Sequence, residues 1–274
     1  MTGARCLSVM THKGNISGAP RRLAARLVVA LALFATAFGA AAWNAPRETL
    51  RYNIMYKWGL INKKAGTVTL TTTPRGDTFN ALLTGATAKW ADRFFMVRDT
   101  LKGTIAQGTF LPSYYEKISN EGGDFEHNIL RYTRAGNTTT ADVDVTRRRK
   151  KDTETRHETK QLSATGVTID MLASYYYMRH LDYASMQPGE TVKVNVFSGK
   201  QKELLTIHYD GLKDVEVDGT RHRCYHITFT FTSRGGKKSS DNMDAWISTD
   251  GRRIPLLLEG KLPVGKVRAV YAGA

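Results

Sequence analysis

The sequence predicts a mostly β protein, built as one large curved antiparallel sheet or half-open barrel with a single helix. Beyond about position 50, segments that alternate apolar and polar residues recur between short Gly- and Pro-containing turns, as in half-buried strands. Only residues 168–181 carry apolar side chains at helical spacing. Roughly a dozen strands in one chain, with no alternation of strand and helix, favour one sheet that curves or closes on itself.

Residues 1–42 are predicted to be a signal peptide that is cleaved. Arg21, Arg22 and Arg26 precede an uncharged apolar run at 27–42 that ends in three alanines. This order of basic, apolar and small residues is typical of secretory signals. The run is shorter than the roughly 20 residues that span a bilayer, although a retained membrane anchor is the alternative. We therefore expect a periplasmic protein whose single domain covers residues 43–274.

The strands are expected in two groups on either side of the helix, and residues 89–97 suggest one or two helical turns or an irregular loop. Residues 59–64 read as a loop. Expected strands before the helix are 51–58, 66–73, 78–83, 98–105, 112–119, 125–134, 138–147 and 153–161. Expected strands after it are 191–197, 202–209, 225–232, 243–248, 254–260 and 264–271.

The helix at 168–181 has an apolar face formed by Met171, Leu172, Tyr175, Met178 and Leu181. Either Thr168 or Asp170 can cap its start, because both side chains accept hydrogen bonds from free backbone N–H groups. A structural interpretation pairs Arg179 with a carboxylate of the sheet, since a buried arginine requires a partner.

The net positive charge of the predicted domain favours contact with anionic partners. Beyond position 42 there are 35 Lys and Arg against 25 Asp and Glu, a net charge of +10. Such a surplus attracts lipid headgroups, lipopolysaccharide or nucleic acid, but it also simply keeps a protein soluble. The export signal argues against nucleic acid. Cys224 is the only cysteine after the signal, so an internal disulfide is excluded.

Three segments together resemble the DUF3108 family. The first is Tyr-Asn-Ile-Met-Tyr-Lys-Trp-Gly-Leu at 52–60, followed by Ala-Gly at 65–66. The second is Asp-Met-Leu-Ala-Ser-Tyr-Tyr-Tyr-Met-Arg at 170–179, where Ala173-Ser174 stands in place of the family's frequent Ser-Ala, followed by Pro-Gly at 188–189. The third is Trp-Ile-Ser-Thr-Asp-Gly-Arg-Arg-Ile-Pro at 246–255, followed by Gly265.

The resemblance covers nearly all of the predicted mature chain, and it implies an exported Gram-negative protein without an assigned activity. The third segment is also similar to the closing hairpin of periplasmic lipoprotein carriers, whose curved sheet holds acyl chains against a helix. This similarity, together with the aromatic-rich strands, predicts the helix on the concave side of the sheet. Fold-level similarity alone is a weak guide to function.

Four residues are candidates to line a space between sheet and helix: Tyr175, Tyr176, Arg179 and Trp246. Tyrosines on a helix more often pack against a sheet with a satisfied hydroxyl. His222, Cys224 and His226 share one face of a predicted strand and are weak metal candidates, because a closed zinc site needs four ligands. We therefore predict no metal and no cofactor.

Five consecutive cations between two strands are a candidate contact for an anionic surface: Arg147, Arg148, Arg149, Lys150 and Lys151. The simpler interpretation is a solvated hairpin tip.

The sequence carries no Gly-x-Ser-x-Gly, His-Glu-x-x-His or P-loop pattern, so we expect a protein that is not an enzyme. The leading hypothesis is a periplasmic protein that binds an apolar or amphiphilic envelope ligand, such as a lipid, in the sheet–helix space. Peripheral membrane contact is compatible with this hypothesis. The alternative is a structural or partner-binding envelope protein with a packed interior.

Overall fold

The computed structural model describes residues 43–233, 242–262 and 264–274, which belong to one compact unit. The predicted signal peptide lies outside the described residues. Within them, no helix combines the length and the apolar character needed to cross a membrane.

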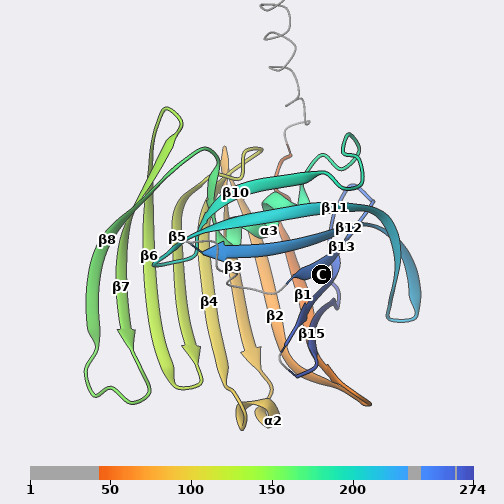
Figure 1. Ribbon diagram of the computed structural model, residues 1–274, viewed down its shortest axis with the longest axis horizontal. Coiled ribbons are helices and arrows are strands. Elements are labelled where there is room, and N and C mark those ends of the chain that lie inside the picture. The colour runs from red at the N-terminus through yellow and green to blue at the C-terminus, as the bar shows by residue number, and fades with distance from the viewer. Residues whose placement is uncertain (1–42, 234–241, 263) are drawn as a thin grey trace, which may run out of the picture. The chain divides into compact units, whose positions relative to one another are not determined.

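The described chain is mostly β, and fifteen strands form one nearly closed, barrel-shaped sheet (Figure 1). The first eight strands are β1 (Glu48–Trp58), β2 (Ile61–Arg75), β3 (Thr78–Thr87), β4 (Val97–Ala106), β5 (Pro112–Glu121), β6 (Asp124–Ala135), β7 (Thr138–Arg148) and β8 (Arg156–Thr165). The others are β9 (Thr168–Asp170), β10 (Thr191–Phe197), β11 (Lys202–Val217), β12 (Thr220–Ser233), β13 (Met243–Ser248), β14 (Pro255–Lys261) and β15 (Lys266–Tyr271). The described helices are α2 (Lys89–Asp92) and α3 (Met171–Arg179).

Two antiparallel meanders share the sheet and meet where β1 pairs with β15. One meander runs from β1 to β8, and the other runs from β10 to β15, with the short β9 added in parallel beside β10. The helix α3 connects β9 to β10 and lies within the curve of the sheet (Figure 1). The predicted fold class, a curved antiparallel sheet with one helix on its concave side, is confirmed.

Three predicted segments differ most from the structure. The helix begins at Met171 rather than at 168, because residues 168–170 pair with β10 as a strand. Residues 59–64 are mostly strand, since Trp58 pairs directly with Ile61 across a tight turn. The expected strands at 202–209 and 225–232 extend into a long hairpin, β11–β12, which continues past an irregularity between Tyr209 and Gly211.

The start of α3 is set by Asp170, whose side chain accepts a hydrogen bond of 2.7 Å from the N–H of Ala173. An aspartate is well suited to this position because it satisfies a backbone donor that has no partner within the helix. Leu172, Ala173 and Tyr176 are completely buried. The sheet therefore surrounds α3, and packing rather than helix propensity stabilises this nine-residue helix.

The concave face of the sheet changes character along its strands. On β6, Leu130 and Tyr132 belong to the main hydrophobic core. Asn128 and Glu126 lie on the same face of this strand, because alternate residues of a strand point to the same side. Glu126 forms an ion pair with Lys200. The interior is thus apolar around α3 and polar toward the strand ends that carry α2.

A buried ion pair joins the helix to the sheet. The guanidinium of Arg179, at the end of α3, forms a bidentate ion pair with the carboxylate of Glu48 at the start of β1. Its Nε and Nη2 also donate to the carbonyls of Arg252 and Arg253, at distances of 2.7–3.0 Å. The Arg179 side chain is 1% exposed, so its guanidinium is shielded from water.

Removing one member of this pair should destabilise the fold strongly. Because Glu48→Gln leaves a buried guanidinium uncompensated, we expect a loss of about 3–5 kcal/mol in the free energy of unfolding, measured by urea denaturation. Lys102→Met, which breaks the exposed pair with Glu116, is the control and should cost less than about 1 kcal/mol. Equal losses in the two variants would contradict this assignment.

Candidate functional site

The sheet does not close along β8, which pairs with β7 on one side only. The chain crosses from β8 to β9 and is fastened there to β10. Asn195 donates from its backbone N–H to the carbonyl of Val167 at 3.0 Å, and from its side chain to the carbonyl of Thr165, also at 3.0 Å. Beyond this fastening, the free edge of β8 faces β10, β11 and the turn between them. We call this gap the seam.

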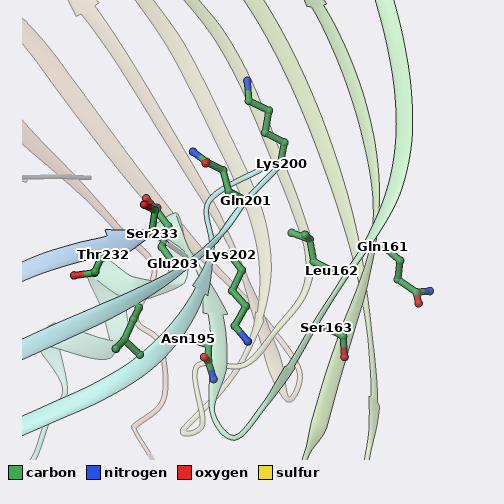
Figure 2. Close-up of a pocket in the computed structure, with 11 residues that line it drawn as sticks. Gln161, Leu162, Ser163, Asn195, Lys200, Gln201, Lys202, Glu203, Thr232 and Ser233 are labelled. Carbon is green, nitrogen blue, oxygen red and sulfur yellow. The ribbon is translucent and has the colours of Figure 1, made fainter. Parts of the chain in front are cut away.

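The seam contains a pocket of about 670 Å³, within the range of roughly 300–1,000 Å³ that is usual for ligand sites. Figure 2 shows Leu162 and Ser163 of β8 on one side of it and Lys202 of β11 on the other. Its lining is mostly polar, with the side chains of Leu162 and Leu204 as its apolar part. The full lining is Gln161, Leu162, Ser163, Asn195, Lys200, Gln201, Lys202, Glu203, Leu204, Thr232 and Ser233.

A second pocket, of about 300 Å³, shares Lys200 with the seam pocket. It brings together part of the predicted cationic run and the start of β6: Asp124, Phe125, Glu126, Arg147, Arg148, Arg149 and Lys200. We call it the basic pocket. Arg147 and Arg148 belong to β7, opposite Glu126 and Phe125, and residues 149–151 lie in the loop that follows. None of the five cations forms an ion pair with a described residue, so their charge is available to a ligand.

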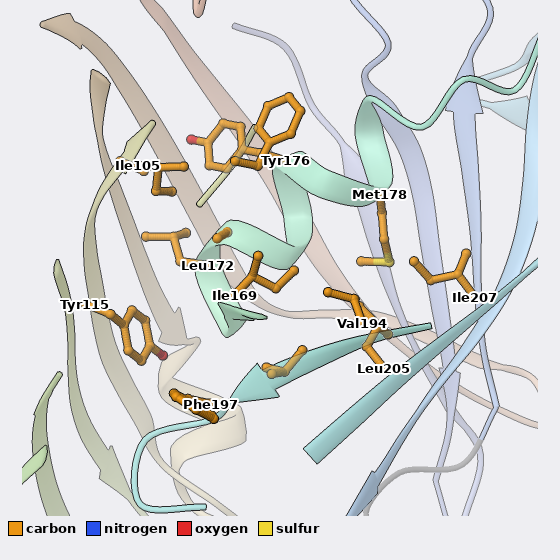
Figure 3. Close-up of a cluster of buried hydrophobic side chains, with 14 of the residues drawn as sticks. Ile105, Tyr115, Ile169, Leu172, Tyr176, Met178, Val194, Phe197, Leu205 and Ile207 are labelled. Carbon is orange, nitrogen blue, oxygen red and sulfur yellow. The ribbon is translucent and has the colours of Figure 1, made fainter. Parts of the chain in front are cut away.

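The four residues predicted to line a sheet–helix space do not line the seam pocket or the basic pocket. Figure 3 shows Leu172 and Tyr176 of α3 directed toward Ile105, while Met178 lies near Ile207. The hydroxyl of Tyr176 is bonded to Thr72 at 2.8 Å, and that of Tyr175 to Tyr52 at 2.9 Å. Neither the seam pocket nor the basic pocket is lined by a residue of α3.

Trp246 is partly buried and packs against the ring of His226, with centroids 4.7 Å apart. Arg179 and Trp246 therefore have protein partners, Glu48 and His226, as the simpler interpretation of Arg179 expected.

The three weak metal candidates are placed along β12 without converging on one point. The Nε2 of His226 is 2.9 Å from the carboxylate of Asp244, and its Nδ1 is 3.1 Å from that of Asp210. Burial raises the pKa of the Cys224 thiol to about 11, so the thiolate that would bind a metal is scarce at neutral pH. Within the described ranges, no group of His, Cys, Asp and Glu has a metal-binding arrangement.

A buried polar cluster surrounds the start of α3. Asp170, Tyr115 and Tyr132 each present an oxygen that has no hydrogen-bond partner within the described part of the chain. Phe197, which pairs with Asp170 across β9 and β10, stacks on Tyr132 with ring centroids 6.0 Å apart. Burial raises the pKa of Asp170 to about 7. Burial and the charge of Asp170 also hold the pKa values of both tyrosines well above the usual range.

Sequence reasoning identified the cationic run but missed Lys200 and Leu162. Lys200 lies in the turn between β10 and β11, and its approach to β6 depends on how the sheet curves. The glycine at position 199 is a sequence feature that points to this close approach. Its φ is +95°, and a Cβ there would lie 2.8 Å from the side-chain nitrogen of Asn128. The turn therefore packs closely against β6, and a larger residue there would displace Lys200 from both pockets.

The fold and its seam define a barrel-like β protein with an incompletely closed sheet. A solved structure of this kind, the crystal structure of a β-barrel-like protein of domain of unknown function DUF1849 from Brucella abortus, is similar. Its TM-score is 0.57 at 7% identity, and the match covers 85% of this chain and 98% of that chain, so the likeness concerns the fold alone. No curated protein matches this sequence.

The family model of DUF3108, described as a protein of unknown function, matches residues 51–271. The chain therefore belongs to the DUF3108 family, as the three sequence segments predicted.

The raised pKa of Asp170 should appear as a pH-dependent stability. With a pKa near 7 in the folded chain and about 3.9 when unfolded, the folded state binds more protons between these values. Stability should therefore fall as pH rises from about 4 to 7. Asp170→Asn keeps the helix cap but cannot ionise, so its advantage over the wild type should grow with pH, to the order of 4 kcal/mol at pH 8.

This pH dependence can be measured by urea denaturation at pH 4, 6 and 8. Asp170→Ala is the control, because it loses the cap and should cost about 1 kcal/mol relative to Asp170→Asn at every pH. Parallel pH profiles for the wild type and Asp170→Asn would show that Asp170 is not the titrating group.

Proposed function

We propose that this chain is an exported, non-catalytic envelope protein that binds an anionic amphiphile in the seam. The observation that carries the proposal is the seam pocket, because its volume suits a small ligand and its lining combines two lysines, one glutamate, amides and hydroxyls with two leucines. A purely apolar ligand would leave the ammonium of Lys202, which has no ion-pair partner within the described part of the chain, without a polar partner. An amphiphile with an acidic head satisfies both kinds of lining.

The basic pocket supports a negative head group. It adjoins the seam pocket through Lys200, and its arginines have no ion-pair partner within the described part of the chain. Glu126 already pairs with Lys200, which leaves the arginine side as the more positive one. Arginine guanidinium groups bind phosphate and carboxylate through paired N–H donors. The head of the proposed ligand would therefore lie toward Arg147 and Arg148, and its chain toward Leu162.

The alternative function is a structural or partner-binding envelope protein. It is favoured by the dense packing around α3, where the polar groups of Tyr175, Tyr176 and Arg179 are all bonded to the sheet. Both functions share export, and they differ in whether the seam takes up a small molecule.

Export can be tested first. We expect membrane-free periplasmic extracts to contain a chain that begins near Trp43, identified by N-terminal mass spectrometry, because the apolar run at 27–42 is short for a membrane anchor. Full-length chain found only in the membrane fraction would contradict this expectation.

Ligand binding can be tested by calorimetry with three probes: dodecyl phosphate below its micelle concentration, dodecyl maltoside and inorganic phosphate. We expect dodecyl phosphate to bind best. Changing both Lys200 and Lys202 to Ser should weaken its binding by roughly tenfold or more, since two charge-assisted contacts are lost. Changing Arg47 and Arg75 to Ser removes the same charge at exposed sites away from both pockets and should leave binding unchanged.

Equal affinity of the wild type and the Lys200/Lys202 variant would disprove the seam site. No binding of either dodecyl probe would favour the structural alternative.

A further inference from the structure

The strand ends that carry α2 expose large apolar side chains together. Leu60 is fully exposed, Phe94 is 83% exposed, and Trp58 and Phe95 are each exposed by more than half. Scattered exposed apolar residues are normal on protein surfaces. Here, however, they occur on three adjacent connections, and we call this set the tip surface: Trp58, Leu60, Ile61, Phe94, Phe95, Leu262 and Val264.

The three connections are held side by side by specific contacts. Lys57, at the end of β1, pairs with Lys266 at the start of β15. A Cβ placed on Gly265, whose φ is +78°, would lie 3.1 Å from the Cβ of Trp58, so the β14–β15 turn lies directly against that residue. On the other side, the indole N–H of Trp90 in α2 donates to the carbonyl of Lys64 at 2.8 Å. Figure 1 shows α2 and the ends of β1, β2 and β15 at one edge of the sheet.

Cations surround these apolar side chains. Residues 57–64, 89–95 and 261–266 include Lys57, Lys63, Lys64, Lys89, Arg93, Lys261 and Lys266. Asp92 is the one acidic residue in these segments, and it is already paired with Arg98 at 2.7 Å. Among the cations, Lys266 is paired with Glu259 of β14 at 2.6 Å. The Nζ of Lys63 lies 4.4 Å from the centre of the Trp90 ring.

The basic run at 147–151 lies at the same end of the sheet. The backbone N–H of Lys150 donates to Asp124 in the β5–β6 connection at 2.7 Å, and Phe95 packs over Gly122 in that same connection. This end of the sheet therefore carries two groups of cations, around the tip surface and at 147–151, separated by Glu121 and Asp124 of the β5–β6 connection.

We propose that the tip surface docks on an anionic lipid bilayer. Trp, Phe and Leu side chains on projecting turns, with lysines around them, match the boundary between headgroups and acyl chains. Lysine stems lie along apolar surface while their ammonium groups reach anionic headgroups. A row of separate projections suits a deformable planar surface better than it suits a rigid protein partner. The residues of the tip surface lie outside both pockets, so tests that change them are separate from tests of the proposed ligand.

The test uses the full chain and vesicles of phosphatidylglycerol or of phosphatidylcholine, with binding measured by co-sedimentation. We expect binding to phosphatidylglycerol that weakens as salt rises from 20 to 200 mM. Changing Leu60 and Phe94 to Ser should weaken it roughly a hundredfold, because two exposed side chains no longer enter the bilayer. Changing Lys57, Arg93 and Lys261 to Ser should have a similar effect at low salt.

Matched controls remove comparable groups elsewhere. Leu82 and Leu212 are exposed leucines away from the tip surface, and changing both to Ser should leave vesicle binding unchanged. Arg47, Arg75 and Lys193 serve as exposed cations for a control triple change to Ser. All variants keep residues 1–42, so any contribution of that segment is common to all of them.

A second measurement reports on insertion directly. Brominated phosphatidylglycerol should quench tryptophan fluorescence in the wild type, and the quenching should diminish in Trp58→Phe. Quenching that is unchanged in Trp58→Phe, or vesicle binding that is unchanged in the Leu60/Phe94 variant, would overturn the proposal. A wild-type dimer that the Leu60/Phe94 variant abolishes, without vesicle binding by either, would instead identify an interface between copies of the chain.

Discussion

The arrangement of this protein depends on one buried ion pair, between Arg179 and Glu48. Isolated ionised groups in a protein interior are costly, and this pair is tolerated because the guanidinium also satisfies two backbone carbonyls. It connects the end of α3, the first strand and the turn between β13 and β14, three segments far apart in the sequence. It therefore fixes where the helix ends inside the sheet, and so which part of the interior is filled and which is left polar.

Much of this arrangement was accessible from the sequence because it is local. Alternating segments gave the strands, and the helix cap at Asp170 follows from an acidic residue before an apolar helical pattern. What sequence could not supply was contact between distant segments. Nothing marks Glu48 as the partner of Arg179, and the residues Thr-Ile-Asp at 168–170 fit the start of a helix as well as the short strand they form. The seam likewise results from the curvature of the whole sheet.

Polar side chains have different roles in the interior and at the two proposed sites. Around α3 the strands bury aromatic and aliphatic side chains, and the hydroxyls of Tyr175 and Tyr176 are bonded to the sheet. Toward the strand ends that carry α2, the same sheet turns charged side chains inward at Glu126 and outward at Lys57 and Lys63. A ligand held in the seam and a bilayer beneath the tip surface would then lie at neighbouring parts of one electropositive end.

The pairing of β1 with β15 has a consequence for how the chain is made. Every other antiparallel pair joins strands consecutive in sequence, so the β1–β8 meander can form as soon as those residues emerge. One edge of β1 stays unpaired until β15 has been made. During synthesis and transport that edge is an open template for pairing with another chain. Loss of β15 would leave that edge open permanently, so a chain truncated before Lys266 should aggregate more readily than the full chain.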